Sequence, residues 1–191
     1  SVADFAAASR VPVISGGDGA NEHPTQALLD LYTIRKELAA SGRSIDGLKI
    51  AMIGDLRYGR TVHSLAKLLC LYSDIEVVLI SPKELCFPGE LVDLMKASGI
   101  SVTVSDHLVK NITDVDIVYS TRIQEERLPR DSRLDANELD ADLDTHPNLA
   151  IFRQTDNGLL VRMALFAMVL NVVDLVDDYA FDVRWFNARQ S

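Results

Sequence analysis

Three short segments carry side chains that suit the recognition of small anions, and the first runs from Gly16 to Gln26. In it, His23 stands directly before Pro24. Proline favours the first position of a helix, so we expect His23 at a helix N-terminus, where the positive end of the dipole favours a neutral imidazole. A neutral imidazole can donate one hydrogen bond to a carbonyl oxygen. The alternative is that His23 and Gln26 only cap this helix.

The second segment, Gly54–Ser64, follows an apolar run and offers two arginines, Arg57 and Arg60. It has neither the G-x-G-x-x-G spacing nor the Gly-Lys-Ser/Thr of a phosphate loop, which argues against a nucleotide site. A guanidinium grips a carboxylate with two parallel hydrogen bonds. We therefore predict Arg60, at the expected start of a helix, as an anion ligand. The alternative for both arginines is a solvated surface position, and we interpret His63 as a packing residue.

The third segment, Ser120–Arg130, follows another apolar run. In an extended chain Arg122 and Gln124 project to the same side, so a guanidinium and an amide can contact one small polar ligand. Chance polarity at the end of a strand is the alternative. Two arginines and two amides around a pocket suit a small dicarboxylate. Nothing in the chain resembles a zinc site, a nucleophile elbow or a Ser/His/Asp order.

Four apolar runs predict the β-strands that must position these segments. Runs such as Ile75–Ile80 are nearly continuous rather than alternating, as expected for parallel strands covered on both faces. Segments long enough for a helix separate the runs, which predicts an α/β fold with a doubly wound, mostly parallel sheet flanked by helices. The predicted strands are Leu48–Ile53, Ile75–Ile80, Ile100–Val104 and Val115–Ser120.

Turn residues and apolar spacing predict three connecting helices and two longer helices that bracket the sheet. The connecting helices are expected at Thr61–Leu71, Glu90–Ala97 and Asp106–Asn111, and the longer ones at Pro24–Ala40 and from about Asn157 through Val176. The nearest thing to a linker is the polar, acidic stretch Pro129–Pro147.

The composition excludes several classes of protein. Among 191 residues, 28 are acidic and 19 basic, and the net charge of −9 arises in Asp131–Asp144 and Asp174–Asp182. A basic nucleic-acid footprint is therefore not expected. No stretch approaches the ~18 apolar residues of a membrane span. The two cysteines, Cys70 and Cys86, lack metal-ligand spacing, and we interpret them as buried free thiols of a reducing, cytoplasmic compartment.

Four segments, in order along the chain, resemble signatures of the aspartate carbamoyltransferases of pyrimidine synthesis. They are Gly16–Ile34 (GGDGANEHPTQALLDLYTI), Gly54–Ser64 (GDLRYGRTVHS), Ser120–Arg127 (STRIQEER) and Phe152–Leu159 (FRQTDNGL). The resemblance covers most of the chain. It implies a carbamoyl-phosphate domain joined to an aspartate domain by two long helices, which agrees with the helices expected to bracket this sheet.

The resemblance also implies roles on the carbamoyl side of the site. His23 would polarise the carbamoyl carbonyl as the catalytic residue, and Gln26 would contact the carbamoyl group. If Leu128-Pro129-Arg130 corresponds to the family's His-Pro-Leu-Pro-Arg, the backbone of Leu128 and Pro129 would accept hydrogen bonds from the carbamoyl amide.

On the aspartate side, the resemblance implies that Arg60 and Arg122 hold the two carboxylates of L-aspartate, with Gln124 beside them. The reaction would be attack of the aspartate amine on carbamoyl phosphate, giving N-carbamoyl-L-aspartate and phosphate. Positioning and charge stabilisation supply such catalysis, so neither metal nor organic cofactor is expected.

The same resemblance divides the chain. The expected parts are the end of the carbamoyl-phosphate domain (1–22), an interdomain helix (23–40), the aspartate-binding domain (41–156), and a C-terminal interdomain helix with its tail (157–191). Family members place a loop, a helix and a strand before their Leu-Pro-Arg, whereas here Leu128 follows Arg127 at once. We therefore expect a missing segment near 127–129. The family's Ser-Thr-Arg-Thr phosphate motif is not found in the chain, so we expect the intact protein, and not this chain alone, to be active.

The resemblance implies a homotrimer and leaves open regulatory chains or fused enzymes. Ornithine carbamoyltransferase is the nearest alternative, but an ornithine side chain needs an acidic or neutral grip, whereas Arg60 and Arg122 are cationic. A non-catalytic amino-acid-binding or assembly domain is a second alternative. A Rossmann oxidoreductase is a distant third.

Overall fold

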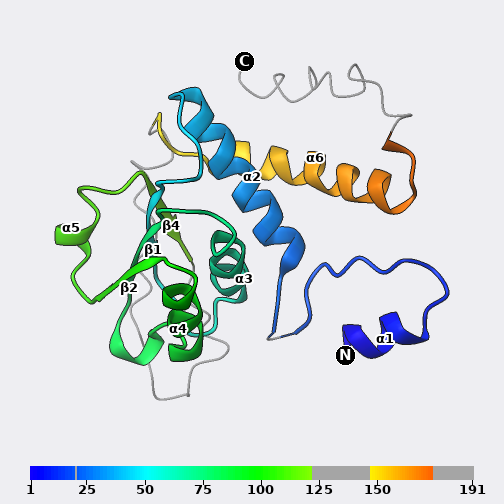
Figure 1. Cartoon of the computed structure of the whole chain (residues 1–191), viewed down its shortest axis with the longest axis horizontal. Helices are drawn as coiled ribbons and strands as arrows, with labels where there is room; N and C mark the ends of the chain where they lie inside the picture. Colours follow the sequence, from blue (N-terminus) through cyan, green and yellow to red (C-terminus); the bar gives the residue numbers. More distant parts are fainter. Residues whose placement is uncertain (20, 122–146, 174–191) are drawn as a thin grey trace.

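The computed structural model describes residues 1–19, 21–121 and 147–173 (Figure 1). Their helices and strands alternate along the chain in the order predicted for an α/β fold. The helices are α1 (Val2–Ala8), α2 (Pro24–Ala40), α3 (Arg60–Leu69), the 3-10 helix η1 (Lys83–Leu85), α4 (Gly89–Ala97), α5 (Leu108–Asn111) and α6 (Ile151–Val169). The strands are β1 (Lys49–Ile53), β2 (Glu76–Ile80), β3 (Ser101–Ser105) and β4 (Ile117–Ser120).

The strands form one parallel sheet in the order β3-β2-β1-β4. β1 is central, and its residues Ile50, Ala51 and Met52 are fully buried. All four predicted strands and their parallel direction are therefore confirmed. Because β2 and β4 flank β1, the carboxyl ends of β1 and β4 are neighbours, and this edge is where ligands bind in open α/β sheets.

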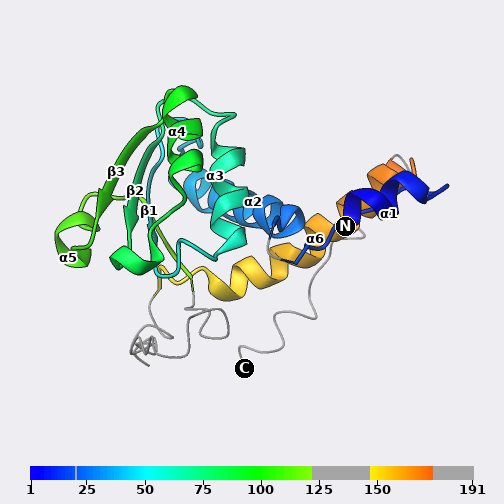
Figure 2. The same cartoon turned by 90° about the horizontal axis from the view of Figure 1, so that it is seen from below.

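Helix α3 packs on the sheet because its apolar residues recur at the spacing of one helical face. Val62, Leu65, Ala66 and Leu69 are all buried in the main core with the side chains of β1. Helix α4 lies on the same side of the sheet, and α2 packs against α3 from outside (Figure 2). Each fully buried leucine stabilises the fold by about 1.5–3 kcal/mol.

Helix α6 crosses α2, and its bounds differ from the prediction. It begins at Ile151, six residues before the expected start at Asn157, and ends at Val169 rather than continuing to Val176. Asn157-Gly158 has the composition of a helix boundary, but both residues are buried within the helix. A Cβ on Gly158 would lie 3.0 Å from Nη1 of Arg162 and 3.4 Å from Leu29 of α2, so glycine here leaves room for the Arg162 guanidinium beside α2.

The exit of β1 needs a glycine. Gly54 has a φ of +102°, and a Cβ on it would lie 2.3 Å from the backbone oxygen of Thr121, just after β4. The Thr121 N–H in turn donates to the Ile53 carbonyl oxygen at 2.9 Å. The ends of β1 and β4 are thus held together at backbone contact distance.

The prediction that both cysteines are buried is wrong. Cys86 is exposed and Cys70 is half-buried, and both are free thiols. Cys86 directly follows η1, a short turn that the apolar pattern did not indicate. Among the described helices, none combines the length and apolar character that crossing a membrane requires.

Candidate functional site

His23 is the N-cap residue of α2, as predicted, and Pro24 occupies the first helical position. Its side chain makes no capping hydrogen bond. Its backbone N–H donates to Ser64 Oγ of α3 at 3.0 Å. Its Nδ1 is buried without a hydrogen-bond partner among the described residues. Burial, followed by the positive charge of Arg60, lowers the pKa of His23. The imidazole is therefore held neutral at pH 7, and the capping alternative does not describe its side chain.

The loop before His23 is fastened to α3 by Glu22. The Glu22 carboxylate accepts hydrogen bonds from the Ser64 hydroxyl and the Lys67 ammonium. Burial opposes ionisation of Glu22, but these two donors outweigh it and lower its pKa. Ser64 bonds both Glu22 and the His23 backbone, so α3 fixes the entry to α2. No local pattern predicts this contact, because the two partners lie 42 and 45 residues from Glu22.

Arg60 begins α3 and reaches back toward α2. Its Nη1 donates to the Gly19 carbonyl oxygen at 2.6 Å. Its guanidinium also lies against Gly17, where a Cβ would stand 3.2 Å from Nη1. The structure thus brings Arg60 close enough to His23, 37 positions away in the chain, to lower the imidazole pKa. Among the described residues the other guanidinium N–H groups of Arg60 make no hydrogen bond, which leaves them for an anion.

The side chain of Arg57 is not directed toward His23 and Arg60. Its Nη1 donates to the Glu84 carbonyl oxygen at 3.3 Å, and its guanidinium lies 5.4 Å from the centre of the Tyr58 ring. His63 packs as predicted, with Nε2 2.8 Å from the Leu56 carbonyl oxygen and its ring 5.2 Å from Phe87, edge to face. Arg57 is thus directed toward Glu84, and His63 toward Leu56 and Phe87.

Gln26 lies one turn into α2 and binds a carboxylate that sequence inspection missed. Its Nε2 donates to Asp30 Oδ1 at 2.8 Å. Asp30 also accepts hydrogen bonds from the Gln154 amide of α6 and from the Tyr119 hydroxyl of β4, the latter at 2.7 Å. Asp30 is only 2% exposed. Burial raises its pKa, and burial also raises the pKa of Tyr119.

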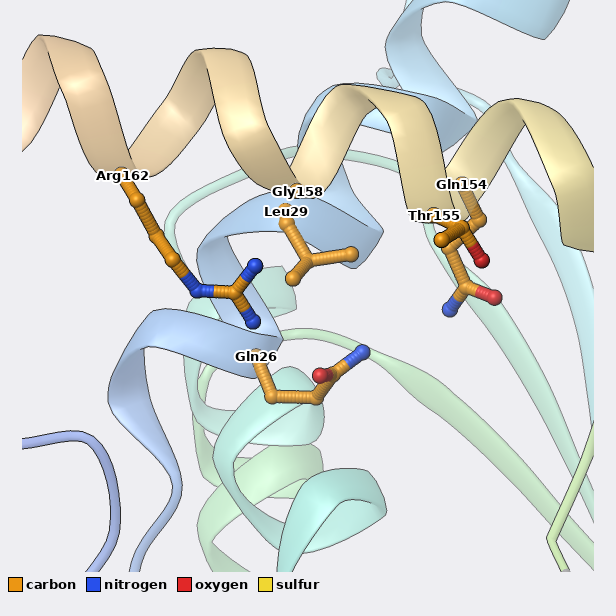
Figure 3. Close-up of a pocket in the computed structure, with 6 residues that line it drawn as sticks. All are labelled: Gln26, Leu29, Gln154, Thr155, Gly158 and Arg162. Atoms are coloured by element: carbon orange, nitrogen blue, oxygen red, sulfur yellow. The ribbon is translucent and has the colours of Figure 1, made fainter.

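A pocket of about 160 Å³ opens between α2 and α6 (Figure 3). The Gln26 carboxamide from α2 and the Arg162 guanidinium from α6 extend toward the same space (Figure 3). The positive charge of Arg162 contributes, after burial and Arg60, to lowering the pKa of His23. The lining residues are Gln26, Leu29, Gln154, Thr155, Gly158 and Arg162.

Four predicted site residues lie outside the described residues, namely Arg122, Gln124, Leu128 and Pro129. The proposed break near 127–129 lies outside them as well. The described range 21–121 ends just after β4 at Thr121, whose N–H donates to the Ile53 carbonyl oxygen at the carboxyl end of β1. Arg122 therefore follows a residue that is anchored at the sheet edge next to Gly54. In the part of the chain that the structure describes, no three His, Cys, Asp or Glu side chains gather as a metal site would need.

Family models match the two parts of the chain separately. The aspartate/ornithine carbamoyltransferase Asp/Orn-binding domain matches residues 46–136, and the carbamoyl-P-binding domain of the same family matches residues 1–36. The aspartate carbamoyltransferase catalytic subunit of Cellvibrio japonicus is 57% identical over 225 residues, covering 100% of this chain and 67% of its own. The chain belongs to the aspartate/ornithine carbamoyltransferase family.

Further relatives support the assignment to this family. The aspartate carbamoyltransferase catalytic subunit of Saccharophagus degradans is 57% identical, covering 99% of this chain and 66% of its own. The catalytic subunit of aspartate transcarbamoylase from M. jannaschii superposes with a TM-score of 0.76 at 38% identity, covering 87% of this chain and 61% of its own. The Trypanosoma cruzi enzyme in complex with aspartate and phosphate gives 0.75 at 34% identity, covering 90% and 60%. The chain thus spans about two thirds of these curated relatives and 60–61% of these solved chains.

Proposed function

We propose that the full-length protein transfers the carbamoyl group of carbamoyl phosphate to the amine of L-aspartate, giving N-carbamoyl-L-aspartate and phosphate. The observation that carries this is the neutral His23 imidazole beside the Arg60 guanidinium at the start of α2. A neutral donor suits a carbonyl oxygen and a guanidinium suits a carboxylate. Family relatives named aspartate carbamoyltransferase support the choice of substrates.

On the carbamoyl side, His23 donates a hydrogen bond to the carbamoyl oxygen and stabilises the negative charge that develops there. Gln26 orients the carbamoyl group from the first turn of α2, and the backbone carbonyls of Leu128 and Pro129 accept from its amide. On the aspartate side, Arg60 binds a carboxylate. Arg122 and Gln124 complete this grip from the segment after β4.

The aspartate amine then attacks the carbamoyl carbon. A C–N bond forms, the C–O bond to phosphate breaks, and the electron pair of that bond leaves with phosphate while the amine releases a proton. Holding the two substrates together supplies much of the rate enhancement.

A steady-state assay of the full-length protein tests the proposal. Carbamoyl phosphate and L-aspartate should give carbamoyl aspartate, and His23→Ala should lower kcat by about 10²- to 10³-fold because it removes an oxyanion donor. Turnover of ornithine in place of aspartate would instead support an ornithine carbamoyltransferase. Aspartate binding without product would support a non-catalytic domain.

The domain plan is part of the same proposal. Residues 1–22 end the carbamoyl-phosphate domain, residues 23–40 and 157–191 link the domains, and residues 41–156 bind aspartate. The Cellvibrio japonicus alignment spans 225 positions against 191 residues here, so the relative has at least 34 positions without a counterpart in this chain. This supports a missing internal segment, which we assign to 127–129. The 191-residue chain should then lack activity that the full-length protein has.

We also propose a cytoplasmic homotrimer. The family has fused members, since the multifunctional protein CAD of Squalus acanthias is 39% identical over 190 residues that make up 8% of it. Light scattering of the full-length protein should give the mass of three chains, and a larger mass would indicate regulatory or fused partners.

A further inference from the structure

We propose that Asp30 is a positioning residue, which holds the carboxamides of Gln26 and Gln154 with their NH₂ groups turned toward it and their carbonyl oxygens free to face the pocket. This role rests on the proposed function, because it assigns what Gln26 presents to the carbamoyl group. Asp30 itself contacts no substrate.

The geometry around Asp30 is unusual for a carboxylate. It is 2% exposed, and its hydrogen-bond partners among the described residues are neutral donors from three different elements. Gln26 Nε2 and Gln154 Nε2 both reach Oδ1, while the Tyr119 hydroxyl reaches Oδ2 at 2.7 Å. Burial of a carboxylate is costly unless its oxygens are hydrogen-bonded, and the three donors offset this cost by stabilising the ionised form.

An ionised carboxylate can only accept hydrogen bonds. A glutamine side chain carries a donor end and an acceptor end of similar shape, and a purely accepting partner selects one of the two orientations. Asp30 therefore binds the NH₂ end of both glutamines. Gln26 and Gln154 both line the pocket (Figure 3), so two carbonyl oxygens become available to an N–H donor such as a carbamoyl amide.

The same carboxylate connects the two halves of the proposed site. Tyr119 precedes the predicted aspartate ligand Arg122 by three residues, and its hydroxyl lies near enough to Thr61, the residue after Arg60, for that side chain to affect its pKa. A shift of Asp30 would thus be felt at Gln26 on one side and at the start of α3 on the other. A displacement of a substrate-positioning group by about 1 Å can lower the rate roughly 100-fold.

Three variants of the full-length protein test this role. Asp30→Leu keeps the approximate shape but removes both acceptor oxygens, Asp30→Glu keeps the acceptor-only character, and Thr33→Val disrupts the neighbouring α2–α6 contact, in which Asn157 donates to Thr33 at 3.0 Å. We expect Asp30→Leu to lower kcat by about 100-fold. Asp30→Glu should retain more of kcat than Asp30→Leu, and Thr33→Val should retain wild-type kcat although it also lowers the unfolding midpoint.

Crystal structures of the wild type and Asp30→Leu should show the Gln26 carboxamide displaced or reversed in the variant. Equal kcat values for Asp30→Leu and Thr33→Val, or an unchanged Gln26, would overturn the role. If Asp30→Leu does not fold, Tyr119→Phe replaces it: both glutamine bonds then remain, so Gln26 should keep its orientation, and a reversed Gln26 would contradict the proposal. A wild type without carbamoyl transfer would refute the proposed function alone, since the orientation of Gln26 is judged from the crystal structures.

Discussion

The imidazole of His23 owes its neutral state to its surroundings, which makes it a source of pH-dependent stability. Its folded-state pKa is lowered, so the folded protein binds fewer protons there than the unfolded chain does. By linkage, the free energy of unfolding rises with pH between the lowered pKa and the ordinary value of about 6.5. The contribution of His23 to stability is present above about pH 6.5 and is lost as the pH falls toward the lowered pKa.

We therefore expect urea unfolding at about pH 7.5 and about pH 5.5 to show a loss of stability at the lower pH that His23→Gln reduces, because glutamine does not titrate. His107→Gln is the matched control, since its side chain is exposed. An undiminished difference in His23→Gln would contradict the prediction.

The guanidinium of Arg60 gives a second prediction. Arg60→Lys should raise the KM for aspartate by about 10- to 100-fold, because an ammonium cannot make two parallel bonds to a carboxylate while also reaching Gly19. Arg57→Lys is the control, since Arg57 is turned toward Glu84 and should leave KM unchanged. Initial rates at saturating carbamoyl phosphate measure both. Equal effects of the two substitutions would argue against a ligand role for Arg60.

Residue types and spacing were sufficient to select His23, Gln26 and Arg60, because each belongs to a short local motif. Asp30 was missed because two of its donors, Tyr119 and Gln154, lie 89 and 124 residues away. The one local sign was its position four residues after Gln26 on a helix, where side chains meet. Polar contacts between distant elements depend on packing that no local pattern encodes.

At the scale of elements, the junction of β1 and β4 depends on Gly54. Gly54→Ala should destabilise the protein by at least about 2 kcal/mol, because a Cβ at φ +102° would lie 2.3 Å from the Thr121 backbone oxygen. Gly89→Ala is the control, since nothing lies within 4 Å of the added Cβ. Chemical denaturation of both variants gives the comparison, and equal stabilities would show that the junction relaxes freely.

The strands were predictable because parallel strands buried on both faces give continuous apolar runs. The start of α6 was not. Asn157-Gly158 resembles a helix boundary when only the local sequence is considered. In the structure Asn157 donates to Thr33 and Gly158 packs against Leu29, so contacts with α2 stabilise the helix through both residues. Packing between helices outweighed local propensity there.

At the scale of the whole molecule, α6 and its C-cap residue carry apolar side chains that the other described residues leave exposed. Phe152, Phe166, Met168 and Leu170 are 58–66% exposed. An apolar surface of this kind binds hydrophobic dyes in a native protein. The 191-residue chain should therefore bind anilinonaphthalene sulfonate without denaturant, and Phe166→Ser with Met168→Ser should lower the fluorescence. Unchanged fluorescence would place the dye elsewhere.

The sequence predicted an acidic protein whose candidate site segments carry positive charge. The described residues agree with this prediction. Arg60 and Arg162 approach His23 closely enough to lower its pKa, although the net charge is −9. The acidic stretches Asp131–Asp144 and Asp174–Asp182 lie outside the described residues. Net charge is a sum over the chain, whereas the pocket experiences only the nearest groups.

The strand order has a consequence for folding kinetics. β4 pairs with β1 although β2 and β3 come between them, and the Lys49–Asp116 contact at this pairing closes a loop of 67 residues. The pairings of β1 with β2 and of β2 with β3 close shorter loops and cost less entropy. As the ribosome releases the chain from its N-terminus, three strands can associate before β4 exists. Arg122, the proposed aspartate ligand, is therefore synthesised after three strands can already have paired, and α6, which brings Gln154 and Arg162 to the pocket, is synthesised later still.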